Sequence, residues 1–312
     1  MLRYLAGRIL QSLATLWVIA TATFFLSRLI PGGPYDPDKL PPAEIRAQID
    51  AYYRLDRPLA VQYLHCMGRL ARLDLGPSYR FLDQPVERLI VRHFPPSAVL
   101  GLLALAISLA LGVPLGVYAA LRQNRPGDWG TLGLAIVGVS VPNFVVGTVL
   151  LYVFVYRLGW ADVGVIAGPR LGGLLLPALT LAGFSLAFVT RMTRASMIEV
   201  LRCDYVRTAR AKGLPARRVV WRHAFRNAML PVLTYLGPLA AALLTGSFVV
   251  EHIFHVPGLG EFFVQSLDDD PPAILGVALF YSTLLILFNL AVDLLYGFAD
   301  PRIAIGARAD LR

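Results

Sequence analysis

Six long apolar runs divide this chain and limit it to structures that can cross a lipid bilayer. A helix needs about 20 predominantly apolar residues to span the hydrocarbon core of a membrane, and each run reaches that length. Four of the runs contain no charged residue. The runs cover residues 9–30, 97–121, 130–156, 171–190, 227–250 and 271–299. The sequence therefore predicts an all-α integral membrane protein with about six transmembrane helices.

Composition supports this class of protein. Hydrophobic residues make up 56% of the 312 positions and charged residues only 16%, which is outside the usual range of soluble domains. The step Ala20-Thr21-Ala22 has the spacing of a signal-peptide cleavage site, but the apolar run continues beyond it through Phe24-Phe25-Leu26. We therefore expect the first run to stay in place as a helix, within a single transmembrane domain that covers residues 1–312.

The distribution of positive charge predicts the orientation in the membrane. Short loops on the cytoplasmic side of membrane proteins are enriched in Lys and Arg. With the N-terminus inside, the inner segments hold seventeen such residues, and the short outer loops hold two, Arg157 and Arg170. Ten of the seventeen lie in segment 191–226. We expect both termini and this segment to be cytoplasmic, and the net charge of +9 then needs no nucleic-acid partner to explain it.

Segment 31–96, between the first two runs, is too long for a plain connection. Residues 43–55 are typical of a short helix, and apolar residues recur at helical spacing over 59–71 after Pro58. A third amphipathic piece, 86–94, leads into the second run. We expect an extracytoplasmic helical insertion, which either receives a partner or only packs against the bundle.

The sequence contains no pattern that indicates catalysis, nucleotide binding or metal binding. Neither HExxH nor GxSxG occurs, and a P-loop needs a lysine between Gly and Ser or Thr. The only lysines are Lys39, which follows Asp, and Lys212, which follows Ala. Cys66 and Cys203 are expected on opposite sides of the membrane without metal-ligand neighbours. We therefore predict no catalytic residue, no metal site and no ATPase site in this chain, and the substrate-binding residues stay unidentified.

Asp293 is the ionisable residue of the last run, with Asn289 one helical turn before it. Carboxylates inside transmembrane segments often mark transport routes. The alternative interpretation is a polar pair that fixes the inner end of the last helix against a neighbour. Both interpretations remain open from the sequence.

Segment 204–226 combines a short helix, a glycine break and a basic helix next to a membrane-spanning run. Gly213 supplies the turn, and Pro215 can open the second helix. Arg218, Arg222 and Arg226 then recur every four residues on one helix face. Such a face is either attracted to anionic lipid or held by another protein at the membrane surface.

Particular residues in this segment resemble the peptide branch of the ABC importer permeases. The matching residues are Tyr205-x-x-Thr208-Ala209-Arg210-Ala211-Lys212-Gly213-Leu214, Arg222-His223-Ala224, Arg226-Asn227-Ala228 and Leu230-Pro231. Further matches, such as Asp74-Leu75-Gly76-Pro77-Ser78 and Pro257-Gly258-Leu259-Gly260, extend the resemblance over nearly all of residues 2–303. Leu214-Pro215 and Tyr235-Leu236-Gly237-Pro238 are most similar to the B-type permease subunit of oligopeptide and dipeptide importers.

The resemblance implies a multi-pass permease subunit in the inner (plasma) membrane of a bacterium, which moves peptides, oligopeptides above all, into the cytoplasm by alternating access. The implied partners are the lipid bilayer, a homologous second permease, two cytoplasmic ATPase subunits and an extracytoplasmic peptide-binding protein. ATP and Mg would be held by the ATPase subunits, and this chain would bind no cofactor.

The resemblance also implies that ATPase coupling occurs through segment 191–226. The implied coupling residues are Tyr205, Arg207, Thr208, Ala209, Ala211, Lys212, Gly213, Leu214, Pro215, Arg218 and Arg222. One departure matters, because many importers have Glu-Ala-Ala where this chain has Arg207-Thr208-Ala209. The role of that glutamate is therefore not carried over.

Three alternatives remain at this point. The same architecture could import nickel chelates or other peptide-like cargo, a stand-alone secondary transporter would depend on ion gradients, and a scaffold would anchor a cytoplasmic enzyme without uptake. No convincing internal repeat is present, which disfavours the secondary transporter. For an importer, the expected surfaces that receive cargo are the 31–96 insertion and the acidic loop 251–270, which contains Glu251, Glu261 and Asp268-Asp269-Asp270.

Overall fold

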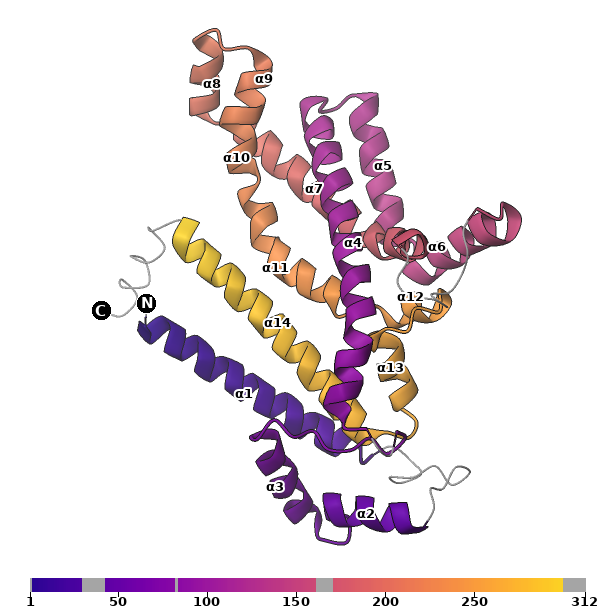
Figure 1. Cartoon of the computed structure of the whole chain (residues 1–312). Helices are drawn as coiled ribbons and strands as arrows, with labels where there is room; N and C mark the ends of the chain where they lie inside the picture. The colour runs from indigo at the N-terminus through magenta and orange to yellow at the C-terminus, as the bar shows by residue number, and fades with distance from the viewer. Residues whose placement is uncertain (1, 30–42, 82–83, 161–170, 300–312) are drawn as a thin grey trace.

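The computed structural model describes residues 2–29, 43–81, 84–160 and 171–299, and within these residues it contains helices and no β-strand. The helices form an elongated bundle (Figure 1). Helices α8 (Asp204–Ala211) and α9 (Ala216–Arg218) lie at one end of the bundle. Helices α2 (Ala43–Tyr53) and α3 (Leu59–Leu70) lie at the opposite end. The predicted all-α class is confirmed.

Four helices are individually long and apolar enough to cross a membrane. They are α1 (Leu2–Leu26), α4 (Val86–Leu121), α7 (Leu171–Leu201) and α14 (Pro271–Ala299). Two bent pairs of helices also pass the same test of length and composition, which gives six spans if each pair is one span. The predicted number of about six is confirmed on that count.

The third apolar run is broken, not a single straight helix. Helix α5 (Pro126–Ser140) is followed by α6 (Asn143–Leu150) and the π-helix η2 (Leu151–Arg157), and the chain bends by 102° between α5 and α6. Pro142 lacks a backbone N–H and forces Val141 into an extended conformation, with φ −86° and ψ 122°. Since α5 has 15 residues and is about 22 Å long, it is too short to cross the bilayer alone.

The fifth run is also bent, but less sharply. The π-helix η3 (Val219–Ala224) and α10 (Phe225–Ala228) follow α9 and lead into α11 (Leu230–Leu244). The angle between the 216–228 part and α11 is 48°. Pro231 lies in the first turn of α11, where its missing N–H costs no hydrogen bond.

Small residues allow the central helices to approach closely. Gly112 and Gly116 of α4 lie directly against α7, where a Cβ on Gly116 would be 2.6 Å from the backbone oxygen of Thr190. Ala104, Ala178 and Ala182 are buried at the same contact. Lipid and protein interior are equally apolar, so membrane helices associate through such close van der Waals packing. Helix α4 also continues through Pro95, Pro96 and Pro114.

The insertion contains the two short helices predicted from sequence, α2 and α3, and its third piece is the first part of α4. Helix α3 packs on the end of α1, where the hydroxyls of Thr21 and Tyr63 are 2.9 Å apart. Tyr53 of α2 donates a hydrogen bond to the Pro77 carbonyl at 2.7 Å. Residues 30–42, including the start of the expected insertion and Lys39, lie outside the described residues.

The expected acidic surface over residues 251–270 is only partly present, because two of its carboxylates are fully buried. Glu251, in α12 (Phe248–Ile253), accepts hydrogen bonds from the Ser97 hydroxyl at 2.8 Å and from the Glu261 amide at 3.0 Å, just inside α13 (Leu259–Ser266). Asp270 accepts hydrogen bonds from the Ser78 hydroxyl and the Ala273 amide. Burial raises the pKa of both carboxyl groups. The acidic-surface interpretation is wrong for these two residues, which hold the fold together.

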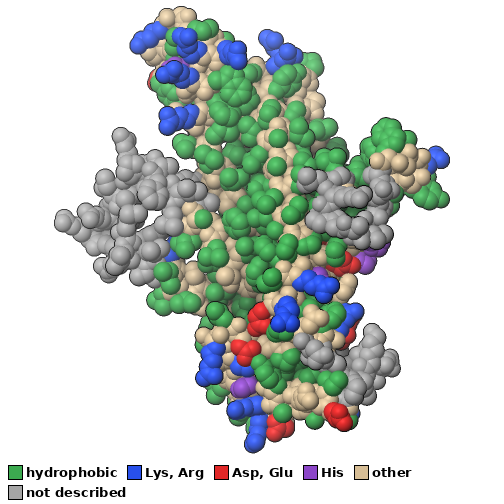
Figure 2. Space-filling view, in the orientation of Figure 1, with side chains coloured by type: hydrophobic (Ala, Val, Ile, Leu, Met, Phe, Trp, Pro, Cys, Tyr) green, Lys and Arg blue, Asp and Glu red, His purple; other side chains and the backbone are tan. Residues whose placement is uncertain are grey.

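The surface agrees with a membrane-spanning bundle. Figure 2 shows hydrophobic side chains over the middle of the molecule, basic side chains at the α8–α9 end, and charges of both signs at the α2–α3 end. Asp293 lies in α14, but its side chain is outside the described part, so both interpretations of it stay predictions.

Gly101 tests the close packing of α4 against α11. A Cβ at this position would collide with the Leu243 carbonyl and lie 2.8 Å from the Leu244 Cα, and backbone atoms cannot move aside cheaply. We expect Gly101→Val to destabilise the protein by about 1–3 kcal/mol, as overpacking usually does. The measurement is the temperature at which half of the detergent-solubilised protein is lost from its monodisperse size-exclusion peak.

Gly133→Val is the matched control, because Gly133 is an exposed helical glycine with no atom within 4 Å of an added Cβ. Equal transition temperatures for the two variants would contradict the close α4–α11 contact.

Candidate functional site

The candidate site is the end of the bundle formed by residues 204–228, which we call the basic tip. Helix α7 ends at Leu201, α8 begins at Asp204, and α9 follows after a turn at Gly213. Figure 1 shows α8 and α9 side by side beyond the ends of the long helices. The chain therefore leaves the bundle, forms a compact helical pair and returns through α10 into α11.

Local sequence explains why α8 forms. Cys203 is extended, with ψ 148°, and Asp204 follows in the first turn, where its negative charge is favourable near the positive end of the helix dipole. The Thr208 hydroxyl donates to the Asp204 carbonyl at 2.9 Å. Val206 and Ala209 lie on the inner face of α8 and are buried. The helix is thus amphipathic over only two turns.

The turn between α8 and α9 requires glycine. Gly213 has φ +72°, a left-handed conformation that residues with a side chain resist. Its N–H donates to the Arg210 carbonyl at 3.0 Å, and the Lys212 N–H donates to the Thr208 carbonyl at 3.0 Å. An added Cβ would have nothing within 4 Å, so the constraint comes from backbone conformation and not from space. Pro215 then precedes α9 as predicted.

A small apolar core holds the basic tip onto the long helices. Val206, Ala209 and Val219 are buried together, with Val200 and Leu201 of α7 packed against them. On the other side of the tip, Asn227 of α10 donates to the Tyr205 hydroxyl at 2.8 Å. Helix α8 is therefore attached to α7 by apolar contacts and to α10 by a hydrogen bond, so the tip should move with α7.

The second half of the tip is wound as a π-helix from Val219 to Ala224. Such segments are rare and frequently occur at functional sites. Val219 and Val220 are buried, whereas Arg218, Arg222 and Arg226 are exposed, as the helix-face prediction requires. The guanidinium groups therefore face away from the apolar core.

The structure brings all of the sequence-predicted coupling residues into this tip, but not all to its surface. Ala209 is 5% exposed and supports the tip from beneath, and Leu214 is half-buried. The exposed ones are Tyr205, Arg207, Thr208, Ala211, Lys212, Gly213, Pro215, Arg218 and Arg222.

Further exposed residues of the tip were not among the predicted site residues, and they include Arg210, Arg217, Trp221 and Arg226. Trp221 is 53% exposed, and its ring centroid lies 4.9 Å from that of Phe225. Trp and Arg are enriched at protein–protein interfaces. The sequence could have indicated this surface, because Trp221 lies beside basic residues in a helix next to a membrane-spanning run.

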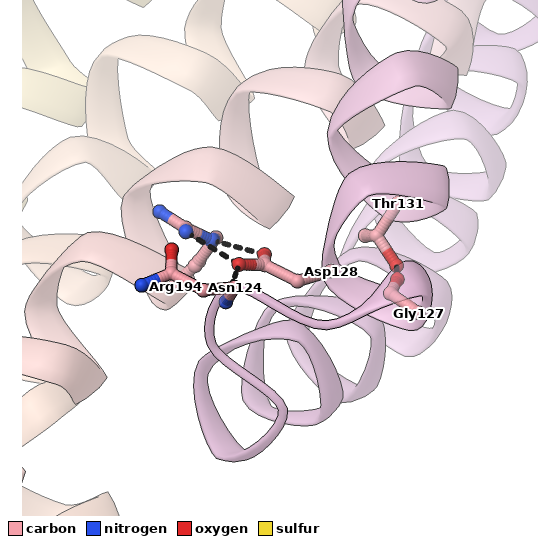
Figure 3. A network of polar contacts seen from close by, with 5 residues as sticks. All are labelled: Asn124, Gly127, Asp128, Thr131 and Arg194. Atoms are coloured by element: carbon pink, nitrogen blue, oxygen red, sulfur yellow. Dashed lines mark hydrogen bonds and ion pairs between the residues drawn. The ribbon is translucent and has the colours of Figure 1, made fainter.

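Helices α7 and α5, which we call the stalk of the tip, are joined by a buried ion pair (Figure 3). Arg194 Nε is 2.5 Å from Asp128 Oδ1, and Arg194 Nη2 is 2.7 Å from Oδ2. The Asn124 N–H also donates to Oδ2, at 2.9 Å. The Asp128 side chain is 2% exposed and that of Arg194 is 20% exposed. This fork-shaped contact fixes both the distance and the angle between the two helices.

The basic tip has an excess of positive charge. Asp204 pairs with Arg207 at 3.5 Å, but both side chains are largely exposed, so the pair contributes little. Most other charges on the tip are cationic. Among the described residues, no group of three His, Cys, Asp or Glu side chains is placed to hold a metal ion. The arrangement suits recognition of an acidic protein surface.

Replacing Asp128 tests the stalk contact. We expect Asp128→Asn to destabilise the protein by about 3–5 kcal/mol, because it leaves Arg194 charged and unpaired in a mostly buried position. The thermal transition of the purified chain in detergent measures this.

Arg207→Gln breaks the exposed Asp204–Arg207 pair and serves as the control, with an expected loss of about 0–1 kcal/mol. A transition of Asp128→Asn no lower than that of Arg207→Gln would show that the buried pair does not fix the stalk.

Comparisons with known proteins agree with this architecture. A family model described as "Binding-protein-dependent transport system inner membrane component" matches residues 112–305. The dipeptide transport system permease protein DppB of Bacillus subtilis (strain 168) is 42% identical over 306 residues, which are 98% of this chain and 99% of that protein. The oligopeptide transport system permease protein OppB of Escherichia coli (strain K12) is 42% identical over 304 residues, 97% of this chain and 99% of that protein.

Solved structures show the same fold at low identity. A chain of the MetNI methionine ABC transporter, in an inward-facing conformation, aligns with TM-score 0.58 and 15% identity over 68% of this chain and 97% of that chain. A chain of an amino acid ABC transporter with histidines aligns with TM-score 0.52 and 19% identity over 67% of this chain and 93% of that chain. The chain therefore belongs to the family of binding-protein-dependent transport system inner membrane components, the permease subunits of ABC transporters.

Proposed function

We propose that this chain is the permease subunit of an ATP-driven importer of short peptides. Two relatives of equal identity, a dipeptide permease and an oligopeptide permease, support peptides as the cargo and favour them over nickel chelates. Equal identity to both gives no preference for peptide length, so the earlier expectation of oligopeptides stays a prediction. Family membership disfavours a stand-alone secondary transporter.

The basic tip is the proposed docking site for cytoplasmic ATPase subunits, which hold ATP and Mg. The observation that carries this proposal is an exposed surface of cations and aromatic rings, built on a rigid helical pair beyond the long helices. A second permease and an extracytoplasmic binding protein complete the proposed assembly.

The proposed orientation places the basic tip in the cytoplasm and the α2–α3 end outside, in the inner membrane of a bacterium with both termini inside. The excess of cations in the inner segments supports this assignment. The binding protein would then deliver cargo at the end of the bundle that contains α2 and α3, which Figure 1 shows opposite the tip.

The proposed mechanism is alternating access driven through the tip. Apolar contacts join α8 to α7, and the Asp128–Arg194 pair joins α7 to α5, so a displacement of the tip is passed to both helices. The bends at Val141–Pro142 and at Met229 leave α6 and α11 at an angle to their preceding segments. Closure of the ATPase subunits would therefore rotate α5 and α7 together relative to these segments, which opens one side of the pathway and closes the other.

Gly213→Val tests docking at the tip. The substitution imposes about 1–2 kcal/mol of backbone strain at a left-handed position and should misalign α8 against α9. We expect the variant to reach the membrane at normal levels but to retain severalfold less ATPase when the tagged chain is extracted gently with its partners. Quantitative mass spectrometry of the recovered complex measures the ratio of ATPase to tagged chain.

Gly159→Val is the matched control, since Gly159 has φ +62°, is exposed and has no atom within 4 Å of an added Cβ, but lies outside the tip. Equal ATPase retention by the two variants would rule out the tip as the docking site.

Uptake tests the function as a whole. Cells that lack the chain should recover uptake of a labelled tripeptide when the wild-type chain is restored, and this uptake should stop when ATP is depleted but persist when ion gradients are collapsed with an ionophore. Uptake that follows the ion gradient and ignores ATP would establish the secondary transporter instead.

A further inference from the structure

A small cavity of about 40 Å³ lies at the end of the bundle opposite the basic tip, between the end of α1, the helices α2 and α3, and the start of α14. Two arginines line it, Arg28 and Arg69, together with Gln62, Tyr53 and Cys66. The permease mechanism described above uses none of these residues. The cavity is therefore a separate feature that needs its own explanation.

Among the described residues, Arg69 is a buried cation without an ion-pair partner. It is 9% exposed, and its Nε and Nη1 atoms have no hydrogen-bond partner. Its guanidinium carbon lies 4.4 Å from the ring centroid of Tyr53 and 4.9 Å from that of Tyr52. These ring faces attract the cation but leave its Nε and Nη1 donors unused.

Arg28 is exposed, and its hydrogen bonds go to neutral groups. Its Nη1 donates to the Phe24 carbonyl at 3.1 Å, and its Nη2 donates to Gln62 Oε1 at 2.9 Å. Among the described residues, neither Arg28 nor Arg69 forms an ion pair with a carboxylate.

Asp74 and Asp270, each next to a residue that lines the cavity, are engaged elsewhere. The Tyr52 hydroxyl donates its proton to the Asp74 carboxylate, whose two oxygens lie 2.9 and 2.8 Å from it. Asp270 accepts from the Ser78 hydroxyl and from the Tyr79 amide. The protein therefore supplies two cations at this cavity and directs its own carboxylates to other donors.

The neutral polar groups of the cavity are already satisfied. Tyr53 donates to the Pro77 carbonyl, and Gln62 Nε2 donates to the carbonyls of Leu55 and Arg57. The Nε and Nη1 donors of Arg69 have no such partner, so the cavity favours an anion over a neutral ligand. Gly76, with φ +86°, also makes room for Arg69, because an added Cβ would collide with Nη1 and with the Tyr53 hydroxyl.

Size and shape restrict the anion. A volume of about 40 Å³ is roughly three times the 10–15 Å³ that one water molecule needs by the same kind of measure. The guanidinium fork matches a carboxylate with two parallel hydrogen bonds. Burying the Arg69 cation without an anion is strongly unfavourable, and one bound carboxylate would offset much of that penalty.

We propose that this cavity binds the carboxylate group of a small solute, with Arg69 and Arg28 as its recognition residues. The carboxylate belongs to a free monocarboxylate or to the C-terminus of a short peptide, since both present the same three-atom group. The proposal concerns this cavity alone and holds whether or not the chain imports peptides.

Cys66 provides a reporter inside the cavity. It lines the cavity, and burial raises the pKa of its thiol while both arginines act to lower it. Cys203, which directly precedes the basic tip, provides an internal control for thiol reactivity in the same molecule. Iodoacetate and iodoacetamide alkylate thiols to products of similar size, but only iodoacetate has a carboxylate. The ratio of their rates at each cysteine therefore reports whether a carboxylate is attracted there.

In the full-length chain in detergent, we expect the iodoacetate-to-iodoacetamide rate ratio at Cys66 to exceed that at Cys203 by about tenfold, the effect of one charge-assisted hydrogen bond. Arg69→Gln should reduce the ratio at Cys66 to that at Cys203 without changing the iodoacetamide rate. Arg28→Gln provides a second variant if Arg69→Gln alters the iodoacetamide rate and hence the packing. Peptide mass spectrometry follows both cysteines in one sample.

Protection experiments separate the two sources of the carboxylate. Sodium acetate and diglycine should both slow alkylation of Cys66 if the cavity accepts any small carboxylate, and diglycine alone should do so if it accepts only peptides. Diglycine amide and sodium chloride at equal ionic strength should give no protection. Equal rate ratios at Cys66 and Cys203, no effect of either arginine variant, protection by chloride, or no reaction of Cys66 with either reagent would each overturn the proposal.

Discussion

The hydrocarbon core of a bilayer offers the backbone no hydrogen-bond partner, and the architecture of this chain depends on that constraint. The described residues of the apolar runs are mostly helical, and part of the segment after the sharpest break packs against neighbouring protein. At the bend after Val141, for example, Gly147 of α6 lies close to Thr180 of α7 and to Phe254, so the segment that follows the bend packs against protein. Small residues along α4 and α7 bring these helices close enough to form that protein environment.

The sequence predicts well which segments form helices, because a membrane-spanning helix is about as long as its run of apolar residues. It also predicts the turn at Gly213, because that turn depends only on backbone conformation. It does not predict which proline bends a helix. Pro114 lies inside a continuous α4, whereas Pro142 accompanies a bend of 102°, and the difference arises from packing between helices that are distant in sequence. The same limit applies to Glu251, whose partner Ser97 is 154 residues away. Ala209 fits the motif at the tip, but its burial depends on contacts with α7 and η3.

Buried polar contacts specify how the packed helices are arranged. Apolar packing alone tolerates rotation and sliding of one helix on another, because many alternative contacts have similar energy. The bidentate Asp128–Arg194 pair removes that freedom between α5 and α7, next to the basic tip. Elsewhere in the molecule, Glu251 connects α12 to α4 through Ser97 and to the start of α13 through the Glu261 amide. Breaking either contact leaves a buried charge or polar group unsatisfied, so each contact resists small displacements of its helices.

The two ends of the bundle use positive charge in different ways. At the basic tip, the arginines are solvated and add little to stability, so they are available to a partner without a large desolvation penalty. At the opposite end, Arg69 is buried against Tyr52 and Tyr53, where its charge is costly and gains strongly from any anion that reaches it. Exposed cations favour fast and adjustable association with a large surface, whereas a buried cation in a small cavity favours one compact anionic group. The burial of Arg69 and the exposure of the arginines at the basic tip therefore separate the proposed small-solute site from the proposed protein-docking surface.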